Sequence, residues 1–262
     1  MKPRLRRTVF PLLALTLAAA LTAGVAQAQD PAAAAQSRWQ STFAAFDKAD
    51  RERQPAADGV LFVGSSSIRF WTRLADDFRS QPVVINRGFG GSTMAECGLL
   101  ARELVVRYKP RQVLVYAGDN DLAEGRTPLQ VLESFALFAS TVRAELPNVR
   151  IGYISVKPSP SRAALLPKIQ ETNNIVGAYL RTQSNIDYID IYTPMMGADG
   201  RPRAGPSLWY RWLWCQPPWH RWSAHSARTG ASRPDSRDTS SRRGHALRCS
   251  SRRTDAEYPA TR

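Results

Sequence analysis

Short apolar runs alternate with helical patterns through the middle of this chain, and this alternation constrains the fold more than any other feature. Five runs have the length and composition of buried strands: residues 59–64, 82–86, 112–117, 149–155 and 186–191. Helical patterns occupy 36–52, 128–146 and 163–183, and Thr127 followed by Pro128 fits an N-cap with a first-turn proline. Repeated strand–helix units predict an α/β fold with a parallel sheet and helices on both faces.

The first 28 residues have the pattern of an export signal. Basic residues precede a short apolar stretch at 12–25, and Ala26-Gln27-Ala28 fits a cleavage site. The alternative is an uncleaved membrane anchor, but the stretch is short for a span of about 20 residues. We therefore expect cleavage after Ala28, a periplasmic or secreted protein, and no stable membrane span.

The last 58 residues, 205–262, have a different composition from the rest of the chain. They contain no Val, Ile, Phe, Met, Lys or Asn, but 11 Arg, 9 Ser, five of the seven Trp and all three His. They show no helical or strand periodicity, and their bias resembles a GC-rich coding region read out of frame. We expect a disordered or frameshifted tail; the alternative is a genuine basic, Trp-rich tail.

The formal charge of +14 lies mostly outside the expected domain. The tail contributes +7 and the signal +4, which leaves +3 for residues 29–204. A strongly basic protein often binds nucleic acid, but this distribution predicts no nucleic-acid partner for the folded part. Cys97, Cys215 and Cys249 are too few for a disulfide framework and have no Cys-x-x-Cys metal spacing.

Polar or glycine-rich motifs follow the first three expected strands, where open parallel sheets bind their ligands. The motifs are Gly64-Ser65-Ser66-Ser67, Gly88-Phe89-Gly90-Gly91 and Gly118-Asp119-Asn120-Asp121. A serine here is either a nucleophile or an ordinary helix cap. The glycines permit positive φ and close approach of a backbone N–H to a ligand, or form a plain turn. An asparagine donates to an oxyanion or forms an Asx-turn.

Together these motifs resemble the SGNH (GDSL-like) hydrolase family, over residues 39–204. The resemblance implies a flavodoxin-like three-layer sandwich with a five-stranded parallel sheet. It implies Ser66 as nucleophile, with Ser65 and Ser67 as alternatives, and Gly91 and Asn120 as the oxyanion hole. It implies no metal and no organic cofactor. The segment 157–160, Lys-Pro-Ser-Pro, looks like a family loop near the site, with no role assigned.

The general base of such a site is missing from its expected place. The family takes a histidine from an Asp-x-x-His block that follows a loop like residues 198–203. The block does not occur here, and none of His220, His225 and His245 has an aspartate three residues before it. The base is therefore unknown, with His220 as a less favoured substitute. Loss of the base predicts activity lowered by several orders of magnitude.

The leading interpretation is an exported serine esterase that acts on small-molecule, carbohydrate or lipid esters. One alternative is a non-catalytic ligand-binding module on the same fold. Another assigns the function to the tail, as a ligand for nucleic acid or anionic membranes. That one is disfavoured because the tail has no amphipathic period.

Overall fold

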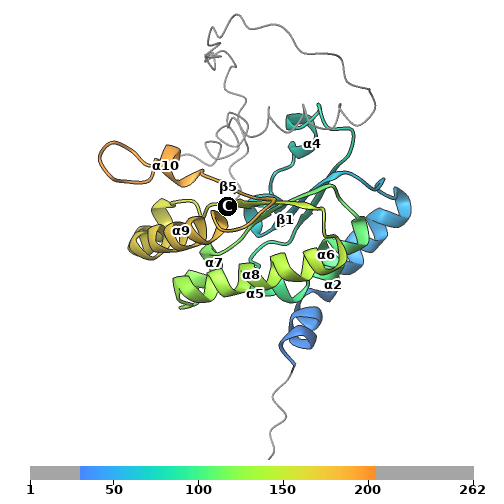
Figure 1. Cartoon of the computed structure of the whole chain (residues 1–262), viewed down its shortest axis with the longest axis horizontal. Coiled ribbons are helices and arrows are strands. Elements are labelled where there is room, and N and C mark those ends of the chain that lie inside the picture. The colour runs from blue at the N-terminus through green and yellow to red at the C-terminus, as the bar shows by residue number, and fades with distance from the viewer. Residues whose placement is uncertain (1–29, 204–262) are drawn as a thin grey trace, which may run out of the picture.

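Five parallel strands form the centre of the protein (Figure 1). The computed structural model describes residues 30–203. The strands lie in the order β2-β1-β3-β4-β5, which is the order of flavodoxin-like sheets. Their bounds are β1 Val60–Gly64, β2 Val84–Gly88, β3 Gln112–Tyr116, β4 Arg150–Ile154 and β5 Ile186–Ile189. All five predicted strands are confirmed, with ends that differ by at most two residues from those expected.

The long helices lie together on one face of the sheet, below it in Figure 1. These are α2 Pro31–Glu52, α8 Pro128–Glu145 and α9 Leu166–Leu180, and the shorter α5 Met94–Leu99 and α6 Ala101–Leu104 lie on the same face. Their apolar sides and the facing strand residues form the larger core cluster, which includes Leu61, Val113 and Phe135. No helix within residues 30–203 is long and apolar enough to cross a bilayer.

The opposite face carries short helices among the described residues. They are α3 Ser66–Arg69, α4 Leu74–Asp77 and α10 Tyr192–Met195. A second cluster, with Phe62, Trp71 and Phe78 in mutual ring contact, lies on this side. Helices on both faces are thus confirmed, with the long ones on one side. The remaining elements are α7 Asp119–Ala123 and the 3₁₀ turns η1 Val106–Tyr108 and η2 Pro160–Leu165.

Local sequence signals explain where the long helices begin. Thr127 caps α8 and forms a reciprocal capping box with Gln130, and Pro128 occupies the first turn as predicted. The expected start of the next helix at Ala163 is wrong, because 160–165 form the 3₁₀ turn and α9 begins at Leu166. Pro167 has no N–H to donate to the carbonyl of Ala163, so an α-helix started there lacks its first hydrogen bond.

Several predictions concern segments outside the described residues. These are the export signal at 1–28, the tail at 205–262, its two cysteines and its three histidines. They stay predictions.

Candidate active site

The first motif forms a sharp turn between β1 and α3. Gly64 has φ +132°, and a Cβ on it would lie 1.9 Å from the carbonyl oxygen of Tyr116 in β3. Only glycine accepts both this φ and this close approach. The N–H of Ser65 donates to the same carbonyl at 2.9 Å. The turn is therefore held against β3, and Ser66 begins the next helix.

The three serines of this motif differ in exposure. Ser65 and Ser67 are buried, whereas Ser66 is half-buried. Ser65 occupies the N-cap position of α3, but its side chain makes no capping hydrogen bond. An ordinary serine cap therefore does not account for the motif.

The second motif leaves β2 beside the first. Gly88 pairs with Gly64 in the sheet, and Phe89 donates its N–H to the Gly64 carbonyl at 2.8 Å. A Cβ on Gly88 would lie 2.2 Å from the backbone nitrogen of Arg69, so this glycine lets α3 approach β2. Of the glycines in this motif, which permit positive φ, only Gly91 adopts it, at +91°. Gly88 is required for a different reason, because any side chain there would overlap the backbone of Arg69.

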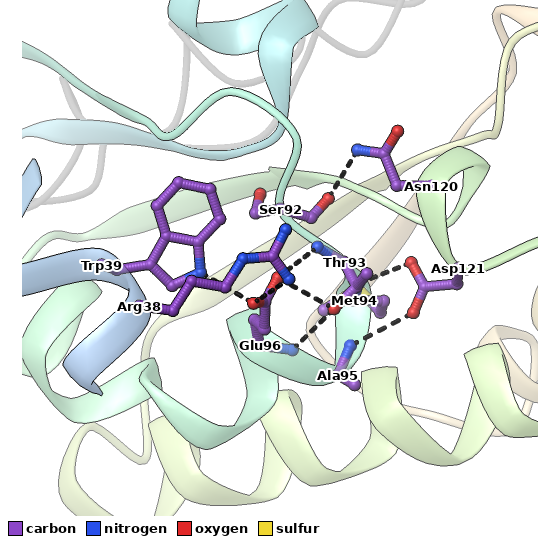
Figure 2. Close-up of polar contacts among 9 residues, drawn as sticks. All are labelled: Arg38, Trp39, Ser92, Thr93, Met94, Ala95, Glu96, Asn120 and Asp121. Atoms are coloured by element: carbon purple, nitrogen blue, oxygen red, sulfur yellow. Dashed lines mark hydrogen bonds and ion pairs between the residues drawn. The ribbon is translucent and has the colours of Figure 1, made fainter. Parts of the chain in front are cut away.

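The third motif brings Asn120 to the second. Gly118, at φ +124°, turns the chain after β3 into α7. The Asn120 side chain donates from Nδ2 to the carbonyl oxygen of Ser92 at 2.8 Å, as Figure 2 shows. The amide therefore contacts the residue next to Gly91.

Two buried carboxylates fix the segment that follows this turn (Figure 2). Asp121 accepts the backbone N–H groups of Met94 at 2.7 Å and Ala95 at 3.3 Å, at the start of α5. Burial raises the pKa of Asp121 above its usual value although these N–H groups lower it. The position of Asn120 relative to the turn is thus reinforced by the residue that follows it.

Glu96 ties the same turn to the N-terminal helix. Its carboxylate accepts the N–H of Thr93 at 2.9 Å in a capping box. It also accepts the indole N–H of Trp39 at 2.8 Å and pairs with Arg38 at 2.9 Å. Because α2 supplies these last two groups, the first helix stabilises the turn that contains Gly91.

The predicted residues Ser66, Gly91 and Asn120 therefore follow the carboxyl ends of three neighbouring strands, which form one edge of the sheet. Gly64 pairs with Gly88 on one side and Tyr116 on the other, and the chain leaves all three strands at that level. Each of the three predicted residues is half-buried.

A half-buried cation lies beside the serine motif. Lys157, from the loop after β4, donates from Nζ to Ser67 Oγ at 2.7 Å and to the hydroxyl of Tyr116 at 3.0 Å. Its Nζ lies 3.4 Å from Asp119 Oδ2. Burial lowers the pKa of Lys157, but Tyr116 and Asp119 raise it more, so it lies above its usual value. A lysine in this state stays protonated at neutral pH, so it donates hydrogen bonds and does not accept the proton of a serine.

A general base is not found among the described residues. Residues 30–203 contain no histidine, and within this range no three His, Cys, Asp or Glu side chains form a group that could hold a metal ion. The buried thiol of Cys97 has a pKa well above its usual value, chiefly because of burial. A buried, protonated thiol is a poor nucleophile.

From the sequence, no role was assigned to four residues that shape this part of the sheet: Glu96, Asp121, Lys157 and Arg162. Arg162 donates from Nη2 to Asn120 Oδ1 at 2.7 Å. Thr93 followed three residues later by Glu96 is a capping-box pattern, so the sequence carried a signal for Glu96. For the other three the sequence gives only charged residues near the expected strand ends, because their partners come from distant segments.

The sequence model of the GDSL-like lipase/acylhydrolase family matches residues 56–209, more than half of the chain. Among solved structures, a GDSL-like lipase from Bacteroides thetaiotaomicron shares 24% identity with a TM-score of 0.55. The alignment covers 72% of this chain and 97% of that one. A protein from Bacteroides fragilis described as an acylhydrolase shares 20% identity with a TM-score of 0.56, over 76% of this chain and 100% of that one. At these identities the likeness shows the shared fold. No curated protein sequence matches the chain.

Proposed function

Because the chain belongs to the GDSL-like lipase/acylhydrolase family, a family of ester hydrolases, we propose that it is a serine esterase whose nucleophile is Ser66. The observation that carries the proposal is the meeting of three separate motifs at one sheet edge. In particular, the Asn120 amide hydrogen-bonds the carbonyl of Ser92, next to Gly91. A serine hydroxyl and a pair of N–H donors are the groups that acyl transfer requires.

Exposure and contacts support Ser66 over its two neighbours. The side chain of Ser65 is fully buried, which leaves no path for a substrate carbonyl. Ser67 accepts a hydrogen bond from the protonated Lys157, which holds its hydroxyl oxygen in the interior. Ser66 alone among the three is partly exposed.

The reaction follows from this assignment. Ser66 Oγ attacks the carbonyl carbon of the ester and gives its proton to a water molecule or to a base in solution, and solvent later supplies the proton of the leaving alcohol. The carbonyl oxygen becomes an oxyanion, which accepts hydrogen bonds from the N–H groups of Gly91 and Ser66 and from Asn120 Nδ2. Collapse of this intermediate releases the alcohol and leaves an acyl group on Ser66, and water then releases the acid.

The proposal assigns no general base, because the described residues offer none. Removal of the base from a serine–histidine pair lowers kcat by several orders of magnitude and leaves the residual contribution of the oxyanion hole and binding. We therefore expect slow hydrolysis that a small external base accelerates.

Imidazole tests this directly with p-nitrophenyl acetate as substrate. The full chain should hydrolyse the ester faster than Ser66→Ala. After the hydrolysis by imidazole alone is subtracted, added imidazole should increase the difference in rate between the wild type and Ser66→Ala. Ser80→Ala, at an exposed serine distant in the fold from the three motifs, is the matched control and should behave like the wild type. Equal rates for the wild type and Ser66→Ala, with and without imidazole, would contradict the proposal.

The lack of a histidine in residues 30–203 favours a second candidate, a ligand-binding module that retains the pocket without turnover. Calorimetric titration with a non-hydrolysable amide analogue of a bound ester distinguishes the two. Binding that requires Asn120, in a chain whose Ser66→Ala variant shows unchanged hydrolysis, would support the module.

We also propose that the protein is exported, with small-molecule, carbohydrate or lipid esters as its substrate class. The pattern of residues 1–28 supports export. N-terminal sequencing of the protein from a bacterial periplasmic extract should begin at Gln29. An intact N-terminus in the cytoplasmic fraction would contradict export.

A further inference from the structure

The loop that follows β4 reaches two of the three motifs with its two cations. Lys157 contacts the serine motif as described above. Arg162, in η2, donates from Nη2 to Asn120 Oδ1 at 2.7 Å. Both cations also approach the same oxygen, Asp119 Oδ2, at 3.4 Å each. The loop therefore connects α3 to the start of α7.

The contact with Arg162 holds the Asn120 amide from the side opposite to the Gly91 turn. Figure 2 shows Nδ2 directed toward Ser92 and Oδ1 directed away from it. With Arg162 on Oδ1 at 2.7 Å and Ser92 O on Nδ2 at 2.8 Å, both ends of the planar amide have partners. Nδ2 carries two hydrogens, and Ser92 takes one of them.

A rotation of the amide by 180° would place both ends against like partners. Oδ1 would face the carbonyl oxygen of Ser92, and the NH₂ group would face the guanidinium of Arg162. In the rotated amide, one contact would pair two acceptors and the other would pair two donors. The two observed contacts therefore select a single orientation of the amide. A cation on Oδ1 also polarises the amide, which strengthens Nδ2 as a donor.

The distances from Arg162 favour the hydrogen bond to the Asn120 amide over an ion pair with Asp119. Arg162 lies 2.7 Å from the Asn120 amide but 3.4 Å from the Asp119 carboxylate. Its side chain is 28% exposed, and that of Asp119 is 9% exposed. The shorter and better contact is with the amide.

We propose that Arg162 is a positioning residue, which orients the Asn120 amide so that the second hydrogen of Nδ2 faces the developing oxyanion. This inference rests on the proposed function for its chemical consequence, although the orientation itself is testable without any activity. Arg162 follows closely after the Lys-Pro-Ser-Pro segment at 157–160, so the proposal gives a role to the loop that contains both.

The first test is spectroscopic and uses the full chain labelled with ¹⁵N-asparagine. The chain has six asparagines, and Asn120→Asp identifies the side-chain pair of Asn120 by its loss. Arg162→Ala should shift that pair and reduce the separation of its two proton signals, while Arg162→Lys should shift it less. Arg181→Ala, at the exposed arginine that caps the C-terminus of α9, is the control. Unchanged Asn120 signals in Arg162→Ala would overturn the proposal.

The second test asks whether Arg162 acts through Asn120. Arg162→Ala should lower kcat for p-nitrophenyl acetate tenfold to a hundredfold with little change in KM, because loss of an oxyanion donor costs about 10²–10³ in kcat. In an Asn120→Ala background the same change should cost less than twofold. Equal factors in both backgrounds would overturn the proposal, since a general structural role persists without Asn120. If hydrolysis does not depend on Ser66, the proposed function fails and the spectroscopic test still decides the orientation.

Discussion

Replacement of Gly64 by alanine tests how closely the turn before Ser66 is held against β3. A Cβ at this position would lie 1.9 Å from the Tyr116 carbonyl oxygen and 2.7 Å from its carbon. The backbone must move by about an ångström to relieve this overlap, which disrupts the hydrogen bond from Ser65 to Tyr116 at 2.9 Å. A positive φ costs an alanine about 1–2 kcal/mol, the lost bond about 1 kcal/mol and the overpacking about 1–3 kcal/mol. We expect a loss of about 3–6 kcal/mol.

Two other glycines separate these contributions. Gly91 has φ +91° and nothing within 4 Å of a new Cβ, so Gly91→Ala carries the conformational cost alone, about 1–2 kcal/mol. Gly88 has no positive φ, but its Cβ would lie 2.2 Å from the Arg69 nitrogen. Gly88→Ala therefore carries the steric cost alone, about 1–3 kcal/mol.

Urea unfolding followed by far-ultraviolet circular dichroism measures all three variants. The shift of the midpoint multiplied by the slope gives the change in the free energy of unfolding. Gly64→Ala should lose more stability than either of the other two variants. A loss for Gly64→Ala no greater than that for Gly91→Ala would refute the close contact between the turn and β3.

Three further predictions concern the polar groups around the edge. Asp121→Asn should lower the free energy of unfolding by about 1–3 kcal/mol, because the two carboxylate oxygens each accept an N–H group of α5, at 2.7 and 3.3 Å. The amide keeps one acceptor oxygen and turns an NH₂ donor toward the other N–H group; an unchanged urea midpoint would contradict this. Trp39→Phe should cost about 1–2 kcal/mol by leaving the buried Glu96 without its indole donor at 2.8 Å, and a melting temperature equal to that of the wild type would argue against the contact. Burial raises the pKa of Tyr116 from 10.0 to about 12, with Asp119 adding to the rise. Since the folded pKa is the higher one, the stabilisation is complete below pH 10 and is lost as the pH rises toward 12. Relative to Tyr116→Phe, the wild type should lose about 2 kcal/mol over that range, and parallel stability curves would exclude the shift.

The strands and the long helices were predictable because each carries a local pattern. The apolar run Val113-Leu114-Val115 has no polar residue, as expected for a strand covered on both faces. The Thr127 and Pro128 pair marks a helix start by hydrogen bonding within four residues. Such features depend on neighbours in the sequence and need no knowledge of the fold.

The supporting residues of the site were not predictable from local pattern. Asp121 caps a helix whose first residue is 27 positions earlier. Lys157 contacts Ser67 across 90 positions, and Arg162 contacts Asn120 across 42. The sequence predicted that the ends of three strands carry the site residues, and this stays a prediction, but the pairs of side chains around them arise only when the sheet brings those ends together.

The central claim, Ser66 as an acyl-accepting nucleophile, is tested most directly by mass spectrometry after brief exposure to p-nitrophenyl acetate. The activated ester has a good leaving group, whereas release of the acetyl group must expel a serine alkoxide without a general base, so the acyl-enzyme should accumulate. We predict one added acetyl group per chain, located by peptide mapping on Ser66 and absent from Ser66→Ala. Acetylation that is absent, or that persists unchanged in Ser66→Ala, would contradict the account.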